Sequence, residues 1–276
     1  MEQVEHLNLP HLLLDVGNTK IGAAIFLDGK MLSTFRSIHK GATSSSHWQH
    51  ELIDYLRPYS SLQHALIASV VPSLNDCLIA CLKRLKLHVR FVEEIPCSIK
   101  TSCQHVGADR LADIYGMRER YLGNCISISL GTALVFNVIK NAQFCGGAIA
   151  PGFGIASLAL ANTCALLSTL DPYEIKRPSV VCGKDTVSNI QSGIYYGTLG
   201  MIEKIIKELK NECFNHESIK VIMTGGVFAD HSPSSLGNQL KEDLKHIVDG
   251  FDEHLTLIGL NAMYKENRHL FLGKNT

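Results

Sequence analysis

The chain has 276 residues, of which 46% are hydrophobic and 19% are charged, and its 26 basic side chains balance its 26 acidic ones. Such a length is typical of two domains with sizeable cores and not of one minimal domain. The balanced charge argues against a dedicated nucleic-acid-binding protein or a protein that binds acidic membranes, and it leaves small-molecule ligands open.

Nine cysteines are scattered along the chain, an odd number without a single CxxC pair. A secreted disulfide framework would show a dense, even set of cysteines in a short chain. The first residues do not resemble a signal peptide, and no apolar run approaches the length of a membrane span. The sequence therefore predicts a soluble cytoplasmic protein with reduced thiols.

In chain order, the first half opens with a meander of three strands, in which a glycine turn and a hairpin at Asp28 and Gly29 connect apolar runs. A helix capped by the serine-rich stretch 43–46, a buried strand, a helix opened by Pro72 and a short strand then follow. This alternation predicts a mixed sheet with helices on its faces. The strands are expected at residues 12–14, 21–27, 31–36, 65–71 and 88–92, and the helices at 52–56 and 74–85.

The second half begins after Asp109 with a helix whose apolar face includes Tyr115 and Leu122, and then the opening pattern returns. Strand, glycine turn, strand, turn and strand occur again in the same order, followed by a long helix and one more strand. These elements are expected at residues 125–128, 134–139, 143–149, 186–213 and 220–223. The repeat predicts two duplicated domains, which we place at residues 1–115 and 116–276.

Two glycine turns are candidates for phosphate binding. In the first, at residues 15–19, Asp15 ends a strand where a carboxylate can hold Mg²⁺, and Gly17 leaves room for phosphate oxygens at backbone N–H groups. The alternative is an ordinary hairpin turn, which favours the same residues. A matching turn at residues 129–133 makes coincidence less plausible, because turns from duplicated halves can face each other across a cleft and grip one polyphosphate.

Two shorter strings carry further hypotheses. Gly225 and Gly226, directly after a predicted strand, would let the backbone approach an adenine or ribose closely, although loop glycines are common. Asp109, at a helix start beside Arg110, could accept a proton from a substrate hydroxyl. On sequence alone a helix N-cap is the more common use of such an Asp, although Ala112 leaves a capping box incomplete.

Other candidates are weak. The string at residues 47–50 has two histidines but no third ligand at a metal-site spacing, so an exposed helix face is expected there. No GxxxxGK[ST] string occurs, which excludes a P-loop enzyme.

In this order, the motifs resemble the type III pantothenate kinases, which belong to the acetate-kinase/Hsp70/actin superfamily. The matching strings are spread over nearly the whole chain. Each string is too short to identify a family by itself, so the resemblance depends on all of them occurring in this order. Besides the strings above, the matching segments are residues 69–72, 146–152, 183–186, 192–193 and 255–260.

The resemblance implies two duplicated actin-like (ribonuclease H-like) α/β domains, with mixed β-sheets flanked by helices and the active site in the interdomain cleft. It implies ATP-dependent phosphorylation of the terminal hydroxyl of pantothenate to 4′-phosphopantothenate, the first step of coenzyme A biosynthesis. The family acts as a homodimer and uses Mg²⁺ together with a monovalent cation, K⁺ or NH4⁺.

The same resemblance implies a role for each residue that occupies a matching position of the family's motifs. Asp109 would be the general base, and Asp15 would organise Mg²⁺. The substrate would contact Gly107, Ala108, Asp109, Arg110 and Thr186. ATP would contact Asp15, Val16, Gly17, Asn18, Thr19, Lys20, Gly131, Thr132, Gly225 and Gly226.

The chain departs from the family pattern at three places. Ser129 stands where the family normally has an Asp associated with the monovalent cation, and Asn137 replaces a further Asp. The loop at residues 101–105 looks shorter than the family's loop and lacks its Tyr and Pro. Two alternatives therefore stay open: a catalytically weakened accessory or regulatory protein that binds nucleotide or pantothenate, and a kinase for another small hydroxy acid.

Overall fold

The structure is a computed structural model that describes residues 9–39, 47–101, 103–167, 174–215 and 217–272. Within them the chain forms two compact units. Unit 1 comprises residues 1–98, 105–119 and 256–276, and unit 2 comprises residues 99–104 and 120–255. The expected serine-rich cap at residues 43–46 lies outside the described residues.

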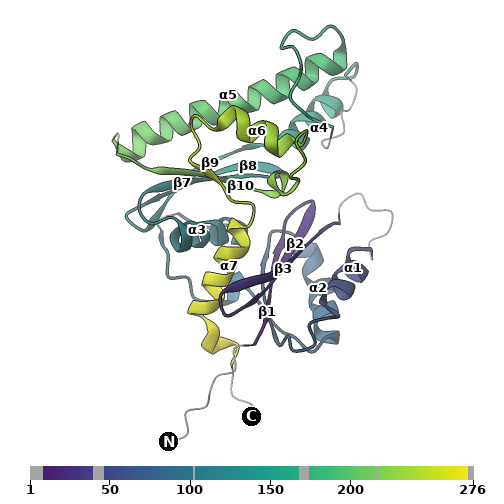
Figure 1. The fold of residues 1–276 in the computed structure, drawn as a ribbon, viewed down its shortest axis with the longest axis vertical. Coiled ribbons are helices and arrows are strands. Elements are labelled where there is room, and N and C mark those ends of the chain that lie inside the picture. Colours follow the sequence, from purple (N-terminus) through teal and green to yellow (C-terminus); the bar gives the residue numbers. More distant parts are fainter. Residues whose placement is uncertain (1–8, 40–46, 102, 168–173, 216, 273–276) are drawn as a thin grey trace, which may run out of the picture. The chain divides into compact units, whose positions relative to one another are not determined.

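Unit 1 is built on a five-stranded mixed sheet in the order β3-β2-β1-β4-β5, in which β1 pairs antiparallel with β2 and parallel with β4. Strands β1, β2 and β3 of this sheet are labelled in Figure 1. Its strands are β1 His11–Val16, β2 Lys20–Leu27, β3 Lys30–Ile38, β4 His64–Ser69 and β5 His88–Phe91. Its helices are α1 His47–Leu56, α2 Pro72–Arg84, α3 Ala108–Arg120 and α7 Leu255–Glu266, with short 3-10 turns η1 Val92–Glu94 and η3 Arg268–Leu270.

The alternation of side chains along β1 decides where the polar residues of unit 1 point. Leu12, Leu14 and Val16 join one core with buried side chains of α1 and α2. His11 points to the opposite face, where its Nε2 donates to Asn261 Oδ1 of α7 at 2.9 Å. Because Asp15 is an even number of residues from His11, its side chain lies on the α7 face and not in the α1/α2 core.

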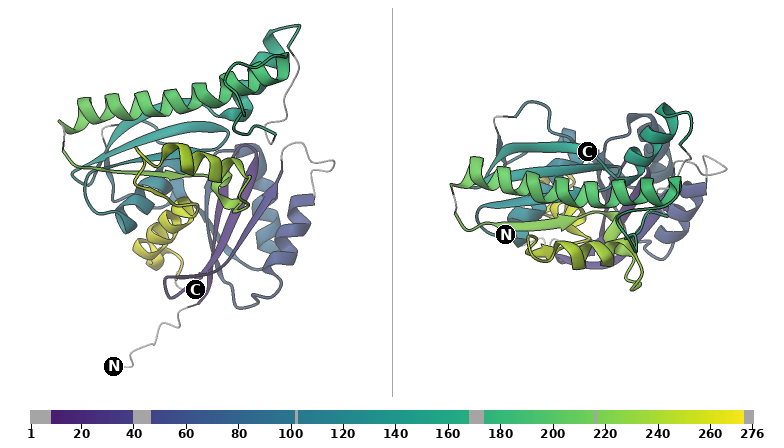
Figure 2. Two further views of the ribbon diagram at one scale, coloured as in Figure 1. Left: turned by 45° about the horizontal axis from the view of Figure 1, so that its top comes forward. Right: turned by 90° about the horizontal axis from the view of Figure 1, so that it is seen from above.

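Unit 2 contains a six-stranded sheet in the order β11-β10-β7-β8-β9-β6. Buried side chains from alternate positions of β7 and β8 form one core with α4, α5 and α6, and the long helix α5 runs along this face (Figure 2). The strands are β6 Lys100–Thr101, β7 Cys125–Leu130, β8 Ala133–Lys140, β9 Gln143–Pro151, β10 Lys220–Thr224 and β11 Gly250–Phe251. The helices are α4 Phe153–Thr163, α5 Thr186–Phe214 and α6 Leu236–Leu244, with a 3-10 turn η2 Gly226–Ala229.

The predicted duplication is confirmed by the sheets. Strands β3-β2-β1-β4-β5 correspond to β9-β8-β7-β10-β11 with the same parallel and antiparallel pairings. The register shifts at matching places, between Ile25 and Phe26 and between Val138 and Ile139. The predicted hairpin is also confirmed, since Asp28 and Gly29 both have positive φ (53° and 75°), as a tight two-residue turn requires.

The observed units differ from the division expected at residues 115 and 116. The chain passes into unit 2 after residue 119 and returns to unit 1 at residue 256, so α7 belongs with the first sheet. Gly259 of α7 packs so closely on α3 that a Cβ atom there would lie 1.7 Å from the Ala112 carbonyl oxygen. A contact between segments so distant in sequence leaves no local signal in either segment.

Two local expectations were wrong. Helix α3 ends at Arg120, and Leu122 is 89% exposed instead of covering an apolar helix face. The expected exposed helix face at residues 47–50 is right for His47 and His50 but wrong for Trp48, which is 1% exposed and belongs to the core because α1 turns that side toward the sheet. Among the described residues, no helix is both long and apolar enough to cross a membrane.

Candidate active site

The first glycine turn connects β1 to β2 and is held by backbone hydrogen bonds. The Gly17 N–H donates to the Lys20 carbonyl at 3.0 Å. From the end of β3, His39 donates through its backbone N–H to the Thr19 carbonyl at 3.1 Å and through Nε2 to the Gly17 carbonyl at 2.7 Å. The turn is therefore fixed, while the Asn18 side chain at its tip is exposed.

Glycine at position 17 is not demanded by the fold of the turn. Its φ is not positive, and a Cβ atom there would lie 3.5 Å from the Lys20 carbonyl oxygen, an ordinary contact distance. A residue with a side chain could adopt this backbone, so the absence of a Cβ atom leaves space beside the turn. That space is what a group approaching the backbone N–H groups would need.

Asp15 precedes this turn, and the pKa of its carboxyl is raised. Burial raises the pKa of its carboxyl to about 7, the negative charge of Asp109 adds to the rise, and Arg36 on β3 opposes it. Lys20, at the start of β2, has a pKa lowered by burial and by the charge of Arg36.

Asp109 lies in the first turn of α3. The Gly107 carbonyl accepts the first helical hydrogen bond from the Leu111 N–H at 3.0 Å, so Gly107 and not Asp109 occupies the cap position. The Arg110 N–H donates to Asp109 Oδ1 at 2.7 Å, and a Cβ atom on Gly107 would lie only 2.7 Å from that oxygen. Glycine at 107 therefore makes room for the Asp109 carboxylate. The N-cap alternative for Asp109 is not what the structure shows.

The carboxyl of Asp109 is partly accessible to solvent. Burial raises its pKa, while the hydrogen bond from the Arg110 N–H and the positive charge of Arg110 act in the opposite direction. Such a group is a better proton acceptor than an ordinary surface carboxylate.

Asp113, one helical turn after Asp109, was missed by the sequence reasoning. Its side chain is buried, with 3% of the residue exposed, and its Oδ1 accepts a hydrogen bond of 2.6 Å from Thr256 Oγ1 at the start of α7. Burial raises its pKa well above the usual range, the Thr256 hydroxyl opposes this, and the charges of Asp109 and Asp15 add to it. The i, i+4 spacing from Asp109 was the available signal, because it puts both carboxyls on one helix face.

In unit 2, backbones converge on the second glycine turn. The Gly131 N–H donates to the Ala133 carbonyl at 2.9 Å, and the Gly152 N–H donates to the Thr132 carbonyl at 3.1 Å. Cβ atoms on Gly152 and Gly225 would lie 2.2 Å from the carbonyl oxygens of Gly131 and Leu130, respectively. Gly225, which follows β10, and Gly152 therefore both pack against the second turn, a contact that the sequence did not predict.

The departures from the family pattern also lie in unit 2. Ser129 occupies the position of β7 that corresponds to Asp15 of β1, and it is partly accessible. Asn137 of β8 is fully buried and donates through Nδ2 to Ser127 Oγ at 3.2 Å. Thr186 is the exposed first residue of α5, directly after its N-cap Asp185, which accepts from the Ser188 N–H at 2.8 Å.

Taken together, unit 1 holds the residues at 15–20 and 107–110, and unit 2 holds those at 129–132, 186 and 225–226. Among the described residues, no group of three His, Cys, Asp or Glu side chains is arranged to hold a metal ion without other ligands. A divalent cation here would have to share its coordination with a phosphate, as Mg²⁺ commonly does.

Comparison with known proteins finds relatives over most of the chain. A family model described as type III pantothenate kinase matches residues 11–208. A type III pantothenate kinase of Agathobacter rectalis is 33% identical over 271 residues, covering 93% of this chain and 98% of that protein. One of Geobacter sulfurreducens is 32% identical, with 93% of this chain and 99% of that protein covered.

A solved structure of a ROK family glucokinase from Streptomyces griseus, in complex with glucose and AMPPNP, covers 94% of this chain and 99% of its own, with a TM-score of 0.51 at 15% identity. At that identity the likeness shows the fold alone, and it confirms the predicted class of two mixed sheets flanked by helices. The family model and the curated relatives decide the family: the chain belongs to the type III pantothenate kinases.

Proposed function

We propose that this protein transfers the terminal phosphoryl group of ATP to pantothenate and so forms 4′-phosphopantothenate, the first step of coenzyme A biosynthesis. Membership of the family supports the substrate. The observation that carries the chemistry is the Asp109 carboxyl, which lies in the first turn of α3, stays partly accessible and has a raised pKa. A kinase of this kind needs such a group to accept the proton of the attacking hydroxyl.

The substrate side of the site is assigned to α3. Arg110, next to the base, would bind the carboxylate of pantothenate or the charge that develops on the phosphoryl group. Gly107 and Ala108 would border the substrate at the helix start. Thr186 would add a contact through its hydroxyl, which is accessible at the first residue of α5.

ATP and Mg²⁺ fit the residues that the turns present. Asp15 is a crowded carboxyl beside a second carboxyl, Asp109, and a divalent cation would relieve both the burial and the repulsion. Val16, Gly17, Asn18, Thr19 and Lys20 would surround the phosphates from the first turn, and Gly131 and Thr132 from the second. Gly225 and Gly226 would border the nucleoside.

Three finer parts of the proposal concern the cation, the assembly and the compartment. Ser129 would give a monovalent cation a hydroxyl and no charge, so we infer a weakened response to K⁺ or NH4⁺. A homodimer is supported by exposed apolar side chains on unit 2, namely Ile149, Ile155, Leu158, Val180, Val181 and Val187. Nine free cysteines support a reducing compartment such as the cytoplasm.

The test is ADP release from Mg-ATP with and without pantothenate, repeated in K⁺, NH4⁺, Na⁺ and cation-depleted buffers. We expect turnover that depends on pantothenate and responds little to K⁺. Asp54→Asn, which changes an exposed carboxylate of α1 with 63% of its side chain accessible, serves as a control that should leave the rate unchanged.

The second candidate function, an accessory protein that binds nucleotide or pantothenate without turnover, is favoured only by the loss of a carboxylate at Ser129. Thermal stabilisation by ATP in a protein that releases no ADP in any of the buffers would contradict the kinase proposal and support this alternative. Turnover with a different hydroxy acid, and none with pantothenate, would contradict the proposed substrate.

A further inference from the structure

Asp113 is a buried carboxyl close to the proposed base. It lies four residues after Asp109 on α3, so both side chains leave the same face of the helix. Only 3% of Asp113 is exposed, and its carboxyl accepts a hydrogen bond of 2.6 Å from Thr256 Oγ1. Within the described residues, no Lys, Arg or His forms an ion pair with it.

The groups that act on Asp113 come from three elements. Strand β1 contributes Asp15, helix α3 contributes Asp109 and Arg110, and helix α7 presents the Thr256 hydroxyl. Two of the three charged groups are thus carboxylates. The one cation, Arg110, has the smallest effect of these groups on the pKa of Asp113. The charged side chains Lys265 and Glu266 of α7 are engaged at the far end of that helix.

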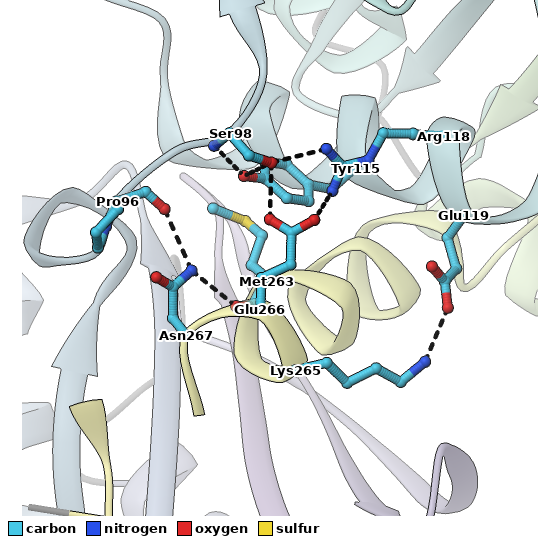
Figure 3. A network of polar contacts seen from close by, with 9 residues as sticks. All are labelled: Pro96, Ser98, Tyr115, Arg118, Glu119, Met263, Lys265, Glu266 and Asn267. Atoms are coloured by element: carbon cyan, nitrogen blue, oxygen red, sulfur yellow. Dashed lines mark hydrogen bonds and ion pairs between the residues drawn. The ribbon is translucent and has the colours of Figure 1, made fainter. Parts of the chain in front are cut away.

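Figure 3 shows that far end, where α3 and α7 are joined by polar contacts. Arg118 of α3 pairs with Glu266 of α7, and Lys265 Nζ lies 2.8 Å from Glu119 Oε1. In the middle, Gly259 packs on the Ala112 carbonyl. At the first turn of α7, the Asp113–Thr256 hydrogen bond joins this helix to α3 one helical turn after Asp109.

An ionised Asp113 would be costly in this position. A buried carboxylate without a cation partner loses its hydration, and two further carboxyls nearby would repel it. A carboxylic acid in the same place keeps the hydrogen bond with Thr256, because its oxygens accept and its O–H can donate. The pKa of Asp113, raised well above the usual range, agrees with this reasoning from burial and partners.

We propose that Asp113 is a positioning residue that works as a neutral carboxylic acid and fixes the first turns of α3 to α7 through Thr256. In this form it holds the backbone that carries Asp109 without placing another negative charge beside the base. The positioning role rests on the proposed function of Asp109, whereas the neutral state of Asp113 does not.

The neutral state is tested without turnover, by infrared difference spectra of metal-free wild-type protein and Asp113→Asn at pH 7 with isotope-labelled aspartate. We expect wild type to show the carbonyl band of a protonated carboxylic acid and Asp113→Asn to lose it. The matched control Asp54→Asn, which removes an exposed carboxyl of α1, should leave the protonated carbonyl band unchanged. Loss of a carboxylate band in Asp113→Asn, with no protonated carbonyl band lost, would overturn the proposal.

The positioning role is tested by steady-state kinetics across pH for Asp113→Asn, Asp113→Ala and Thr256→Val. Asp113→Asn keeps a neutral group with the same hydrogen-bonding reach, so we expect its kcat within about twofold of wild type and an unchanged acid limb of kcat/KM. Asp113→Ala and Thr256→Val remove the anchor and should lower kcat by about tenfold with little change in the KM for ATP.

Two results would contradict the positioning role. An acid limb that moves down by about one pH unit or more in Asp113→Asn would mean that a negative charge had been removed beside Asp109. A loss of kcat in Asp113→Asn as large as in Asp113→Ala would show that a neutral substitute does not suffice. A wild-type protein without pantothenate-dependent turnover would instead contradict the proposed function, and the infrared spectra would still decide the state of Asp113.

Discussion

The two glycine-turn meanders share a backbone plan and differ in charge. Strands β1 and β7 each have six residues with the same order of buried positions, in which only the fifth residue is partly accessible. That residue is Asp15 in unit 1 and Ser129 in unit 2. The comparison teaches that the duplicated scaffold supplies the turn, while a single side chain decides whether the turn also carries a carboxylate.

The glycines at and around the two turns fall into two classes, according to whether the fold leaves room for a Cβ atom. Gly17 and Gly131, at the tips of the two turns, have no backbone or steric need to be glycine, since a Cβ atom would lie 3.5 Å and 4.0 Å from its nearest neighbour. Gly152 and Gly225 are required by packing, because a Cβ atom would overlap a carbonyl oxygen at 2.2 Å. The fold itself therefore explains the second pair, and we propose that the first pair is glycine because a ligand approaches the turn.

The largest effect is expected at Asp109 of unit 1, the proposed base. Asp109→Asn keeps the size of the side chain and removes its ability to accept a proton, so kcat should fall by about 10²- to 10⁴-fold. ATP binding, measured by calorimetry, should be retained. A variant with more than about a tenth of the wild-type kcat would show that Asp109 is not the base.

Asp15 and Ser129 permit a matched test of the two turns. Asp15→Asn should weaken the response to Mg²⁺ by about 10- to 100-fold, because it removes the carboxylate that would organise the cation. Ser129→Ala should change the same titration by less than about threefold, since a hydroxyl contributes little to a divalent site. Equal losses in both variants would mean that the turns share the cation and that the comparison is wrong.

The two classes of glycine can be separated by measuring stability and binding together. Gly225→Ala places a Cβ atom against the Leu130 carbonyl at a φ of 125°, so unfolding in urea should show a loss of about 2 kcal/mol or more. Gly131→Ala should leave the free energy of unfolding within about 0.5 kcal/mol and weaken ATP binding instead. A Gly131→Ala protein that binds ATP normally would remove the ligand-based explanation for this glycine.

The smallest effect concerns stability against pH. The Asp15 carboxyl binds its proton more tightly when folded, since its pKa is about 7 instead of 3.8. Its contribution to stability is therefore fully present below about pH 4 and is lost as the pH rises through about 7. Relative to wild type in metal-free buffer, Asp15→Asn should gain at least about 1 kcal/mol between pH 5 and pH 8 in urea unfolding. A constant difference would contradict the raised pKa.

Much of the fold could be predicted from the sequence because its signals are local. The apolar runs, the Asp28-Gly29 hairpin and the repeated glycine turns each depend on residues close together in the chain, and all are found in the structure. The placement of α7 in unit 1 could not be predicted, because it depends on contacts such as Gly259 against Ala112.

The candidate site shows the same limit. The turns and the string at residues 107–110 were found from their residue types, whereas Asp113 and Thr256 were missed. These two residues are 143 positions apart in the chain, and neither type is distinctive on its own. In the sequence, only the four-residue spacing between Asp109 and Asp113 indicates that the two side chains share a helix face. The burial of Asp113, which the sequence does not show, is needed to infer its chemical role.

The most direct test of the account is to identify the product of ATP, Mg²⁺ and pantothenate by mass spectrometry and ³¹P NMR, for wild type beside Asp109→Asn and Asp54→Asn. The account predicts 4′-phosphopantothenate in stoichiometric amounts with ADP for wild type and Asp54→Asn, and a loss of both products for Asp109→Asn. ADP without a phosphorylated pantothenate, or equal product from Asp109→Asn, would contradict it.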